Sequence, residues 1–290
     1  MAQYVSSHGF EYGVKHFINP KSGSVVEITA EILEKSKSEV SDLLKLGAVY
    51  VNNCRQIDDA EIKENQTLRV HTKPRRFNCD YVWNERIVFE NEDFIILNKP
   101  SGVPSHPSVD NIIDNSLVQL SRARQIPLQI THRLDTLTEG LIVYGKNSTF
   151  VKDFNLQMSA RQIEKKYVAL IESSKTLSEK LIHYMEPSPR APKTVSSVAN
   201  DGWAYCELHI LNQKEHPMGS WVQIKLLTGR THQIRSQLAF EGTPICGDEL
   251  YGAILKWRPQ AIALRACELQ FEWNHQFMKF NLDENFDSHL

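Results

Sequence analysis

Residues 131–145 read THRLDTLTEGLIVYG, a polar turn that runs directly into an apolar segment. The end of this stretch, residues 141–144, is typical of a buried strand. Asp135 lies just before that strand, between Arg133 and a turn rich in threonine and glycine. Two interpretations stay open at this point. Asp135 either caps the turn by hydrogen bonding to nearby backbone, or it is a nucleophilic carboxylate that an arginine keeps ionised.

A second polar stretch, residues 228–248, reads TGRTHQIRSQLAFEGTPICGD. Its pattern predicts a helix over residues 231–240, with Arg230 immediately before the helix and Arg235 within it. One interpretation is a solvated basic face. The other is that Arg230 points into a site, while His232 and Arg235 contact a phosphate or orient the loop.

Lys165, Lys166 and Tyr167 begin a further predicted strand. A tyrosine at such a position is more often a core residue with a satisfied hydroxyl than a catalyst. Residues 121–166 contain eight Lys/Arg and four Asp/Glu, a local net charge of +4. Such a patch suits a nucleic-acid backbone, although each lysine taken singly also fits a solvated face.

The order of the expected elements predicts an α+β protein with a mixed, largely antiparallel sheet and flanking helices and loops. The reason is that strands outnumber helices and do not alternate regularly with them. The expected strands are 87–89, 94–98, 141–144, 167–172, 203–211, 221–227 and 261–271, and the expected helices are 111–124, 148–161 and 231–240. Before them we expect a small helix–strand domain over residues 1–77. It has helical material at 27–46, Gly47 as the helix cap, and strands at 48–52 and 66–72. Residues 78–85 form the expected linker, 86–278 the expected catalytic domain and 279–290 a frayed tail.

Composition narrows the class of protein. The 290 residues carry 33 Lys/Arg and 35 Asp/Glu, a net charge of −2, so any site for a polyanion depends on local clustering. No apolar run approaches the 20 residues of a membrane helix, and the N-terminus lacks the pattern of a signal peptide. The five cysteines are widely spread without a C-x-x-C, which disfavours disulfide and zinc frameworks. We therefore expect a cytoplasmic protein. We also expect a monomer.

Three segments together resemble the RluA-type pseudouridine synthases. They are LNKPSGVPSHP at 97–107, HRLDTLTEG at 132–140 and the stretch at 227–248, and KYVAL at 166–170 also matches that family. Residues 43–52, LLKLGAVYVN, are similar to a small RNA-binding module shared with a ribosomal small-subunit protein. Glu139 and Gln237 depart from the family pattern, since a small residue and a histidine are usual there.

The resemblance implies isomerisation of uridine to pseudouridine in structured RNA, without metal or other cofactor. Ribosomal RNA is the favoured substrate, with transfer RNA as the alternative. Asp135 matches the family's nucleophile, Tyr167 its base-packing tyrosine and Arg230 the arginine that pairs with the aspartate. His132 and Arg133 are candidates to fill the space of a flipped uridine. The remaining candidate RNA contacts are His106, Lys166, His232 and Arg235.

Two other classes of protein remain as alternatives. A glycosidase needs two carboxylates that flank the scissile bond, and Asp135 and Glu139 lie only four residues apart in a turn. A non-catalytic RNA-binding protein would keep the basic patch but would not need Asp135, Tyr167 and Arg230 together. Both alternatives therefore explain the sequence less completely than a pseudouridine synthase does.

Overall fold

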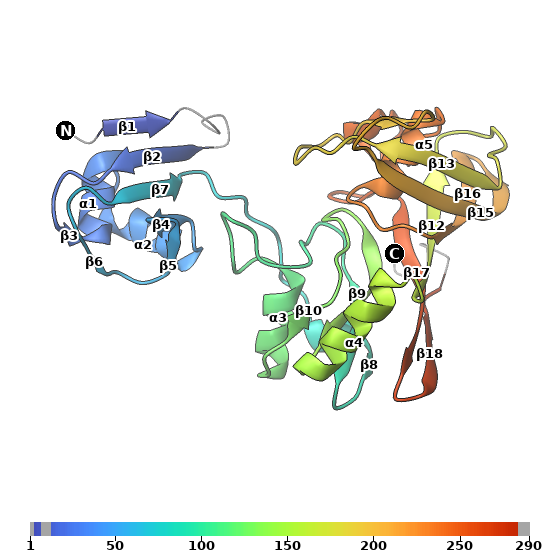
Figure 1. Cartoon of the computed structure of the whole chain (residues 1–290), viewed down its shortest axis with the longest axis horizontal. Helices are drawn as coiled ribbons and strands as arrows, with labels where there is room; N and C mark the ends of the chain where they lie inside the picture. Colours follow the sequence, from blue (N-terminus) through green and yellow to red (C-terminus); the bar gives the residue numbers. More distant parts are fainter. Residues whose placement is uncertain (1–2, 7–12, 284–290) are drawn as a thin grey trace. The chain divides into compact units, whose positions relative to one another are not determined.

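The computed structural model describes residues 3–6 and 13–283 and divides the chain into two compact units (Figure 1). The N-terminal unit runs to Cys79 and also includes His106–Gln119, and the C-terminal unit consists of Asp80–Ser105 and the residues from Leu120 onward. We had expected residues 106–119 to belong with the catalytic domain. The first boundary, after Cys79, lies within the expected linker at 78–85. Residues 106–119, however, join the N-terminal unit rather than the C-terminal one.

Two helices, α1 (Val25–Leu33) and α2 (Lys37–Lys45), replace the continuous helical stretch expected at 27–46. The break has a local cause. Glu34 adopts a left-handed conformation with φ 54°, and Ser36 begins α2 with a capping box. In this box the Ser36 hydroxyl accepts from the Glu39 backbone N–H, and the Glu39 carboxylate accepts from the Ser36 N–H. The two reciprocal bonds satisfy backbone donors that a helix start leaves free.

Gly47 ends α2 as the sequence predicts, with φ 69°. Its N–H donates to the carbonyl of Leu44, and the N–H of Ala48 donates to that of Leu43, which is the Schellman arrangement. The chain then enters an antiparallel sheet. Its strand order is β1 (Gln3–Ser6), β2 (Val14–Ile18), β7 (Thr67–His71), β4 (Val49–Val51) and β5 (Cys54–Gln56), and β3 (Gly23–Ser24) pairs separately with β6 (Glu61–Ile62).

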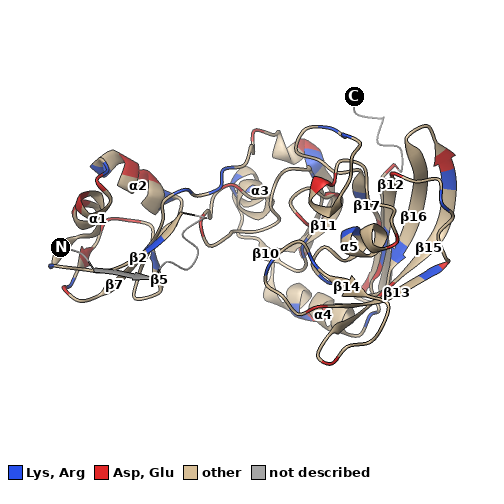
Figure 2. Cartoon of the chain, turned by 90° about the horizontal axis from the view of Figure 1, so that it is seen from above, with Lys and Arg blue, Asp and Glu red and all other residues tan. Residues whose placement is uncertain are grey.

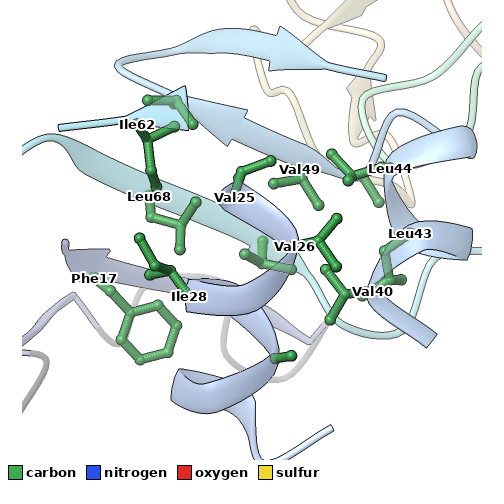
Figure 3. Packing of buried hydrophobic residues seen from close by; sticks show 14 of the residues in the cluster. Phe17, Val25, Val26, Ile28, Val40, Leu43, Leu44, Val49, Ile62 and Leu68 are labelled. Atoms are coloured by element: carbon green, nitrogen blue, oxygen red, sulfur yellow. The ribbon is translucent and has the colours of Figure 1, made fainter. Parts of the chain in front are cut away.

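Aliphatic side chains from both helices and from this sheet form the core of the N-terminal unit (Figure 3). Val25, Ile28 and Val40 from the helices are almost fully buried, and so are Val49 and Leu68 from the strands. The unit therefore has a hydrophobic core of its own.

The segment His106–Gln119 is held to the rest of the N-terminal unit by charge and by apolar packing. Arg75 binds Asp110 through two hydrogen bonds of 2.9 and 2.7 Å, and Arg76 binds Asp114 at 2.7 Å. Ile113 packs against the core described above. Removal of residues 1–77 alone would therefore leave these two aspartates without their arginine partners.

The strands of the C-terminal unit form one mixed sheet. In spatial order they are β14 (Val195–Ser196), β13 (Lys180–Met185), β15 (Ala204–His216), β16 (Gly219–Leu226), β12 (Glu164–Ile171), β17 (Leu264–Trp273), β11 (Glu139–Gly145), β9 (Phe94–Lys99) and β8 (Ile87–Glu90), with β10 (Gln129–Ile130) on β11 and β18 (Gln276–Asn281) on β17. In the described part of the sheet the β11–β17 pair is parallel and the other pairs are antiparallel. The expected α+β class with a largely antiparallel sheet is confirmed.

Helices pack on this sheet at two places. Helix α4 (Ser148–Ser159) buries Phe150 and Phe154 against β9, β11 and β17, and its N-cap is Asn147 rather than the expected Ser148. Helix α5 (Gln233–Phe240) lies beside β13, where Gln237 donates to the Leu181 carbonyl (Figure 1).

The remaining elements are short. Helix α3 spans Ser116–Arg124, so residues 111–115 of the expected helix are not helical, and single 3-10 turns occur at Trp83–Arg86 and Glu249–Tyr251. The tail expected from residue 279 begins later, because β18 pairs with β17 as far as Asn281, and residues 284–290 lie outside the described residues. Within the described ranges, every helix is too short or too polar to cross a bilayer.

Candidate active site

Asp135 lies in a loop that the preceding KPSGVPS segment holds in place. The Ser105 hydroxyl donates to the Leu134 carbonyl at 2.7 Å and accepts from the Leu134 N–H at 3.0 Å. Lys99 is fully buried, and its ammonium donates to the carbonyls of Val103, Pro100 and Thr136. These bonds fix the backbone on both sides of Asp135. The segment at 99–105 therefore supports the backbone that carries the carboxylate.

The cation beside Asp135 is Arg235. Its Nη1 lies 3.5 Å from Oδ2 of Asp135, while Nε and Nη2 bind Asp248 at 2.6 and 2.8 Å. Burial opposes the charge of Arg235, but the two carboxylates outweigh it and raise the pKa of the guanidinium. Arg235 is thus a fixed, permanently charged neighbour of Asp135.

His232 approaches Asp135 from the turn before α5. It has a left-handed conformation with φ 58°, and its Nε2 lies 3.8 Å from Oδ2 of Asp135. The other ring nitrogen, Nδ1, is 3.0 Å from the hydroxyl of Tyr251. Burial lowers the pKa of His232 despite the nearby Asp135, so this imidazole is mainly neutral at neutral pH.

Tyr167 reaches the same pocket from β12. Its side chain is buried, and its hydroxyl makes no hydrogen bond within the part of the chain that the structure describes. Burial, together with the negative charge of Asp135, raises the pKa of this hydroxyl above its usual value. Tyr167 is therefore a protonated phenol whose ring forms part of the pocket wall.

The pocket that these residues enclose has a volume of about 250 Å³. It is smaller than the roughly 300–1,000 Å³ of sites for drug-sized ligands, and it suits a single planar ring. Arg133 and Arg230 also line it, and both are exposed. His132 lines it as a neutral imidazole, since burial and the charge of Lys165 lower its pKa to about 3.

Several expected roles change in the structure. Arg230 lines the pocket but makes no ion pair within the described residues, so the expected pairing of Arg230 with Asp135 is wrong, and Arg235 takes that place. Lys166 is not in the pocket wall but is ion-paired with Glu268 at 2.7 Å. His106 belongs to the N-terminal unit and does not line this pocket.

Sequence reasoning missed three participants. Lys165 lines the pocket in place of Lys166, and Asp248 and Tyr251 orient Arg235 and His232. Strand alternation gives a signal for Lys165, because it is two residues from Tyr167 and side chains two apart share a face. No local sequence pattern indicates Asp248 and Tyr251, because they contact Arg235 and His232 from a separate segment of the chain.

The two departures from the family pattern have structural explanations. Glu139 begins β11 and is bonded to Arg265 of β17 at 2.8 Å and to Arg258 at 2.9 Å, which ties the parallel strand pair together. Gln237 is fully buried and donates to the Leu181 carbonyl, with His183 Nδ1 at 3.0 Å. Neither residue lines the pocket.

The pocket is lined by a carboxylate, a buried tyrosine and a fixed arginine, and it lies on a mixed sheet with flanking helices. This arrangement is compatible with base chemistry on a nucleic acid. Residues 93–240 match the family model for RNA pseudouridylate synthase. The match covers half of the chain and includes Asp135, Tyr167 and Arg235. This chain belongs to the RNA pseudouridylate synthase family.

Individual relatives agree with this assignment. The chain is 37% identical over 210 residues to the chloroplastic RNA pseudouridine synthase 6 of Oryza sativa subsp. japonica, covering 63% of this chain and 44% of that protein. It therefore spans less than half the length of this relative. It is 26% identical over 265 residues to ribosomal large subunit pseudouridine synthase C of Buchnera aphidicola, covering 83% and 82% of the two chains.

The fold is also similar to that of solved structures. Human RNA pseudouridylate synthase domain containing 1 aligns with a TM-score of 0.57 and 23% identity, over 71% of this chain and 86% of that one. This similarity concerns the fold alone.

Proposed function

We propose that this protein isomerises specific uridines in structured RNA to pseudouridine, with Asp135 as the nucleophile. One observation carries the proposal. The Asp135 carboxylate opens into a pocket of about 250 Å³ beside Tyr167, with the guanidinium of Arg235 fixed 3.5 Å away. A carboxylate in a partly buried pocket beside a fixed guanidinium is suited to attack on an electrophilic sugar carbon. Membership of the family supports the same chemistry.

The pocket also constrains the form of the substrate. A uridine inside a duplex cannot reach Asp135, so the nucleotide has to be turned out of its stack. Turning out costs least in a loop or bulge, where bases are already unstacked. Tyr167, as a protonated and apolar wall, would pack on the extruded ring. Structured RNA with an accessible loop is accordingly the substrate class that we infer.

The glycosidase alternative lacks its second carboxylate. Glu139 is buried and bonded to Arg265 and Arg258, outside the pocket. Among the described residues that line the pocket, Asp135 is the only acidic one. A hydrolysis that needs an acid and a base on opposite sides of the bond has no second group here.

Ribosomal RNA is the substrate that we favour, with transfer RNA as the alternative, and we propose that the N-terminal unit contributes to RNA contact. Helix α1 carries acidic residues only and α2 carries both signs of charge (Figure 2), and Lys35 and Lys37 are ion-paired with Glu39 and Glu27. This helical face is therefore poorly suited to phosphates, and we infer that the unit contacts RNA through another of its faces. Photo-cross-linking of bound RNA followed by peptide mapping tests the unit's role, which fails if no cross-link falls before Cys79.

Mapping pseudouridines in the RNA of cells with and without the protein tests the proposed function. We expect one or a few sites in ribosomal RNA to disappear with the protein, and to return with the wild-type gene but not with Asp135→Asn. Sites in transfer RNA alone would overturn the ribosomal assignment. An unchanged pseudouridine map in every RNA would overturn the enzymatic function itself.

A further inference from the structure

Lys165 is a half-buried lysine whose ammonium has no carboxylate partner among the residues that the structure describes. It lines the pocket with Asp135 and Tyr167, and no ion pair or side-chain hydrogen bond of Lys165 occurs within the described residues. Burial alone lowers the pKa of Lys165 to about 8. A charged group that is removed from water without gaining an oppositely charged partner destabilises the folded protein. Such a group is typical of a site that gains its partner with the ligand.

The neighbouring lysines show that this state is particular to Lys165. Lys166, the next residue, pairs with Glu268 at 2.7 Å, and Lys225 on the adjacent strand pairs with Glu164 at 2.6 Å. These two ammonium groups are neutralised outside the pocket. Lys165 shares its side of β12 with Tyr167, two residues away, and so belongs to the pocket wall.

A glycine leaves the space into which Lys165 extends. A Cβ atom at Gly229 would lie 3.3 Å from Nζ of Lys165, closer than an ordinary contact. The lysine tip therefore reaches across the pocket from β12 to the turn that contains Arg230. Any ring held between Tyr167 and this turn would have the Lys165 ammonium at its edge.

We propose that the Lys165 ammonium donates a hydrogen bond to a carbonyl oxygen of the bound uracil ring and stabilises the negative charge on that ring during catalysis. The inference rests on the proposed function. In the isomerisation the C1′–N1 bond breaks and its electron pair leaves with the ring, so that the ring carries one negative charge shared by N1 and the carbonyl oxygens. The Asp135 oxygen bonds to C1′ as the C1′–N1 bond breaks, and this C1′–O bond breaks again when the C1′–C5 bond forms and the carboxylate is released. C5 then loses its proton and N1 gains one, so atoms and charge balance. A fixed cation at the oxygen lowers the energy of the charged ring.

The position of Lys165 favours the base over the RNA backbone as its partner. Arg133 and Arg230 are exposed and free of ion pairs within the described residues, and they are accessible to phosphates at the opening of the pocket. Lys165 is half-buried and so less accessible than either arginine. A charge contact with the backbone would also make affinity depend on salt, and this difference provides a test.

Lys165→Met is the main variant, because methionine keeps most of the side-chain volume and removes only the charge. Lys279→Met, on β18 and ion-paired with Glu268 at 3.1 Å, is the matched control. The measurement is tritium release from total RNA of cells lacking the protein, labelled with [5-³H]uridine. We expect turnover to fall at least tenfold for Lys165→Met and to stay unchanged for the control. For Lys165→Met we also expect an unchanged salt dependence of RNA affinity and a melting temperature no lower than that of the wild type.

The pH profile separates a catalytic charge from a structural one. The other ionisable groups of the pocket are His132, Asp135, Tyr167 and His232, together with the guanidinium groups of Arg133, Arg230 and Arg235. The pKa values of both histidines are lowered and that of Tyr167 is raised, so these three groups stay neutral between pH 7 and 9 on the reference scale. We expect kcat/KM of the wild type to fall above pH about 8, because Lys165 then loses its proton. Lys165→Arg should stay active to higher pH, because arginine keeps its proton there. Titration of the uracil N3–H affects both proteins equally, so it does not contribute to the difference between them.

Three results would overturn the inference. The first is full turnover by Lys165→Met. The second is a loss of RNA affinity with a smaller salt slope and intact turnover, which would assign Lys165 to a phosphate. The third is the same alkaline fall in Lys165→Arg as in the wild type. Absence of tritium release from the wild type would instead overturn the proposed function, and this inference with it.

Discussion

Arg235 approaches Asp135 from the interior of the C-terminal unit, with its Nη1 atom 3.5 Å from the Asp135 carboxylate. The opposite edge of the guanidinium is bonded to Asp248, so the arginine is fixed before any RNA binds. The guanidinium therefore presents a fixed positive charge to the Asp135 carboxylate, and the pair is preorganised for catalysis.

Asp135→Asn tests this role directly. The amide has nearly the same size as the carboxylate but is a far poorer nucleophile, so we expect tritium release from uridine-labelled RNA to fall below detection. Melting temperature and RNA affinity should remain close to those of the wild type. Substantial turnover by the folded variant would remove Asp135 from the nucleophile role.

Arg235→Met and Arg230→Met form a pair that separates the two arginines. Loss of Arg235 leaves Asp248 buried without its partner, and we expect the free energy of unfolding to fall by about 3–5 kcal/mol. Arg230 is exposed, so Arg230→Met should change stability by less than about 0.5 kcal/mol and act mainly on RNA affinity. Urea unfolding and filter binding measure the two effects. Equal stability of the variants would contradict the assignment of Arg235 as the buried partner.

The exchange of these arginines shows where sequence reasoning reaches its limit. The motifs singled out Asp135 and Tyr167, and both line the pocket. The apolar pattern indicated strand β11, which follows Asp135. The expected helix began at Thr231, whereas α5 begins at Gln233. His232 is left-handed, a conformation that a non-glycine residue rarely adopts and that tertiary contacts with Tyr251 accompany. Helix α5 starts directly after this residue and carries Arg235 at a buried position, which residue spacing alone does not indicate.

Gly140 provides a test of the backbone that supports the site. Its φ is 113°, and a Cβ atom there would overlap the Ala266 carbonyl and lie 2.7 Å from the Ala266 backbone nitrogen on β17. We expect Gly140→Ala to cost more than about 3 kcal/mol of unfolding free energy, since both conformation and space oppose it.

Gly242→Ala is the matched control for this prediction. Gly242 also has a positive φ, 75°, but a Cβ atom there meets nothing within 4 Å in the described structure. We expect Gly242→Ala to lower the free energy of unfolding by only about 1–2 kcal/mol, which is the cost of the left-handed conformation for an alanine. Similar losses in the two variants, measured by urea unfolding, would show that the contact with Ala266 is unimportant.

His132 should make the protein sensitive to acid. Its folded-state pKa is about 3, below the value of about 6.5 expected in the unfolded chain, so the unfolded state binds more protons between these values. Stability from this group is therefore fully present above pH 6.5 and is lost as the pH falls. We expect the wild type to lose about 2 kcal/mol more than His132→Gln between pH 7.5 and pH 5. Urea unfolding at both pH values measures this difference, and equal losses would mean that His132 does not stay neutral in the folded protein.

RNA affinity should fall steeply with salt even though the whole chain has a net charge of −2. Many basic side chains around the site are neutralised within the protein, including Arg124 and Lys146 by Glu90 and Lys225 by Glu164. Arg133 and Arg230 are not ion-paired within the described residues, and both are exposed at the pocket. Each phosphate contact contributes roughly −0.7 to −0.9 to the slope of log affinity against log salt, so these two arginines together account for about −1.4 to −1.8. We expect at least one further phosphate contact and a total slope steeper than about −2.

The contribution of single arginines follows from the same relation. Arg133→Gln and Arg230→Gln should each make the slope shallower by about 0.7–0.9, and the double variant by about twice that amount. Lys225→Gln serves as the control, because Lys225 already has a carboxylate partner, and we expect its slope to equal that of the wild type. Fluorescence anisotropy with a labelled ribosomal RNA fragment over a range of salt concentrations gives these slopes. If the Lys225 variant changed the slope as much as the arginine variants did, phosphate contacts would depend on overall charge rather than on the free cations at the pocket.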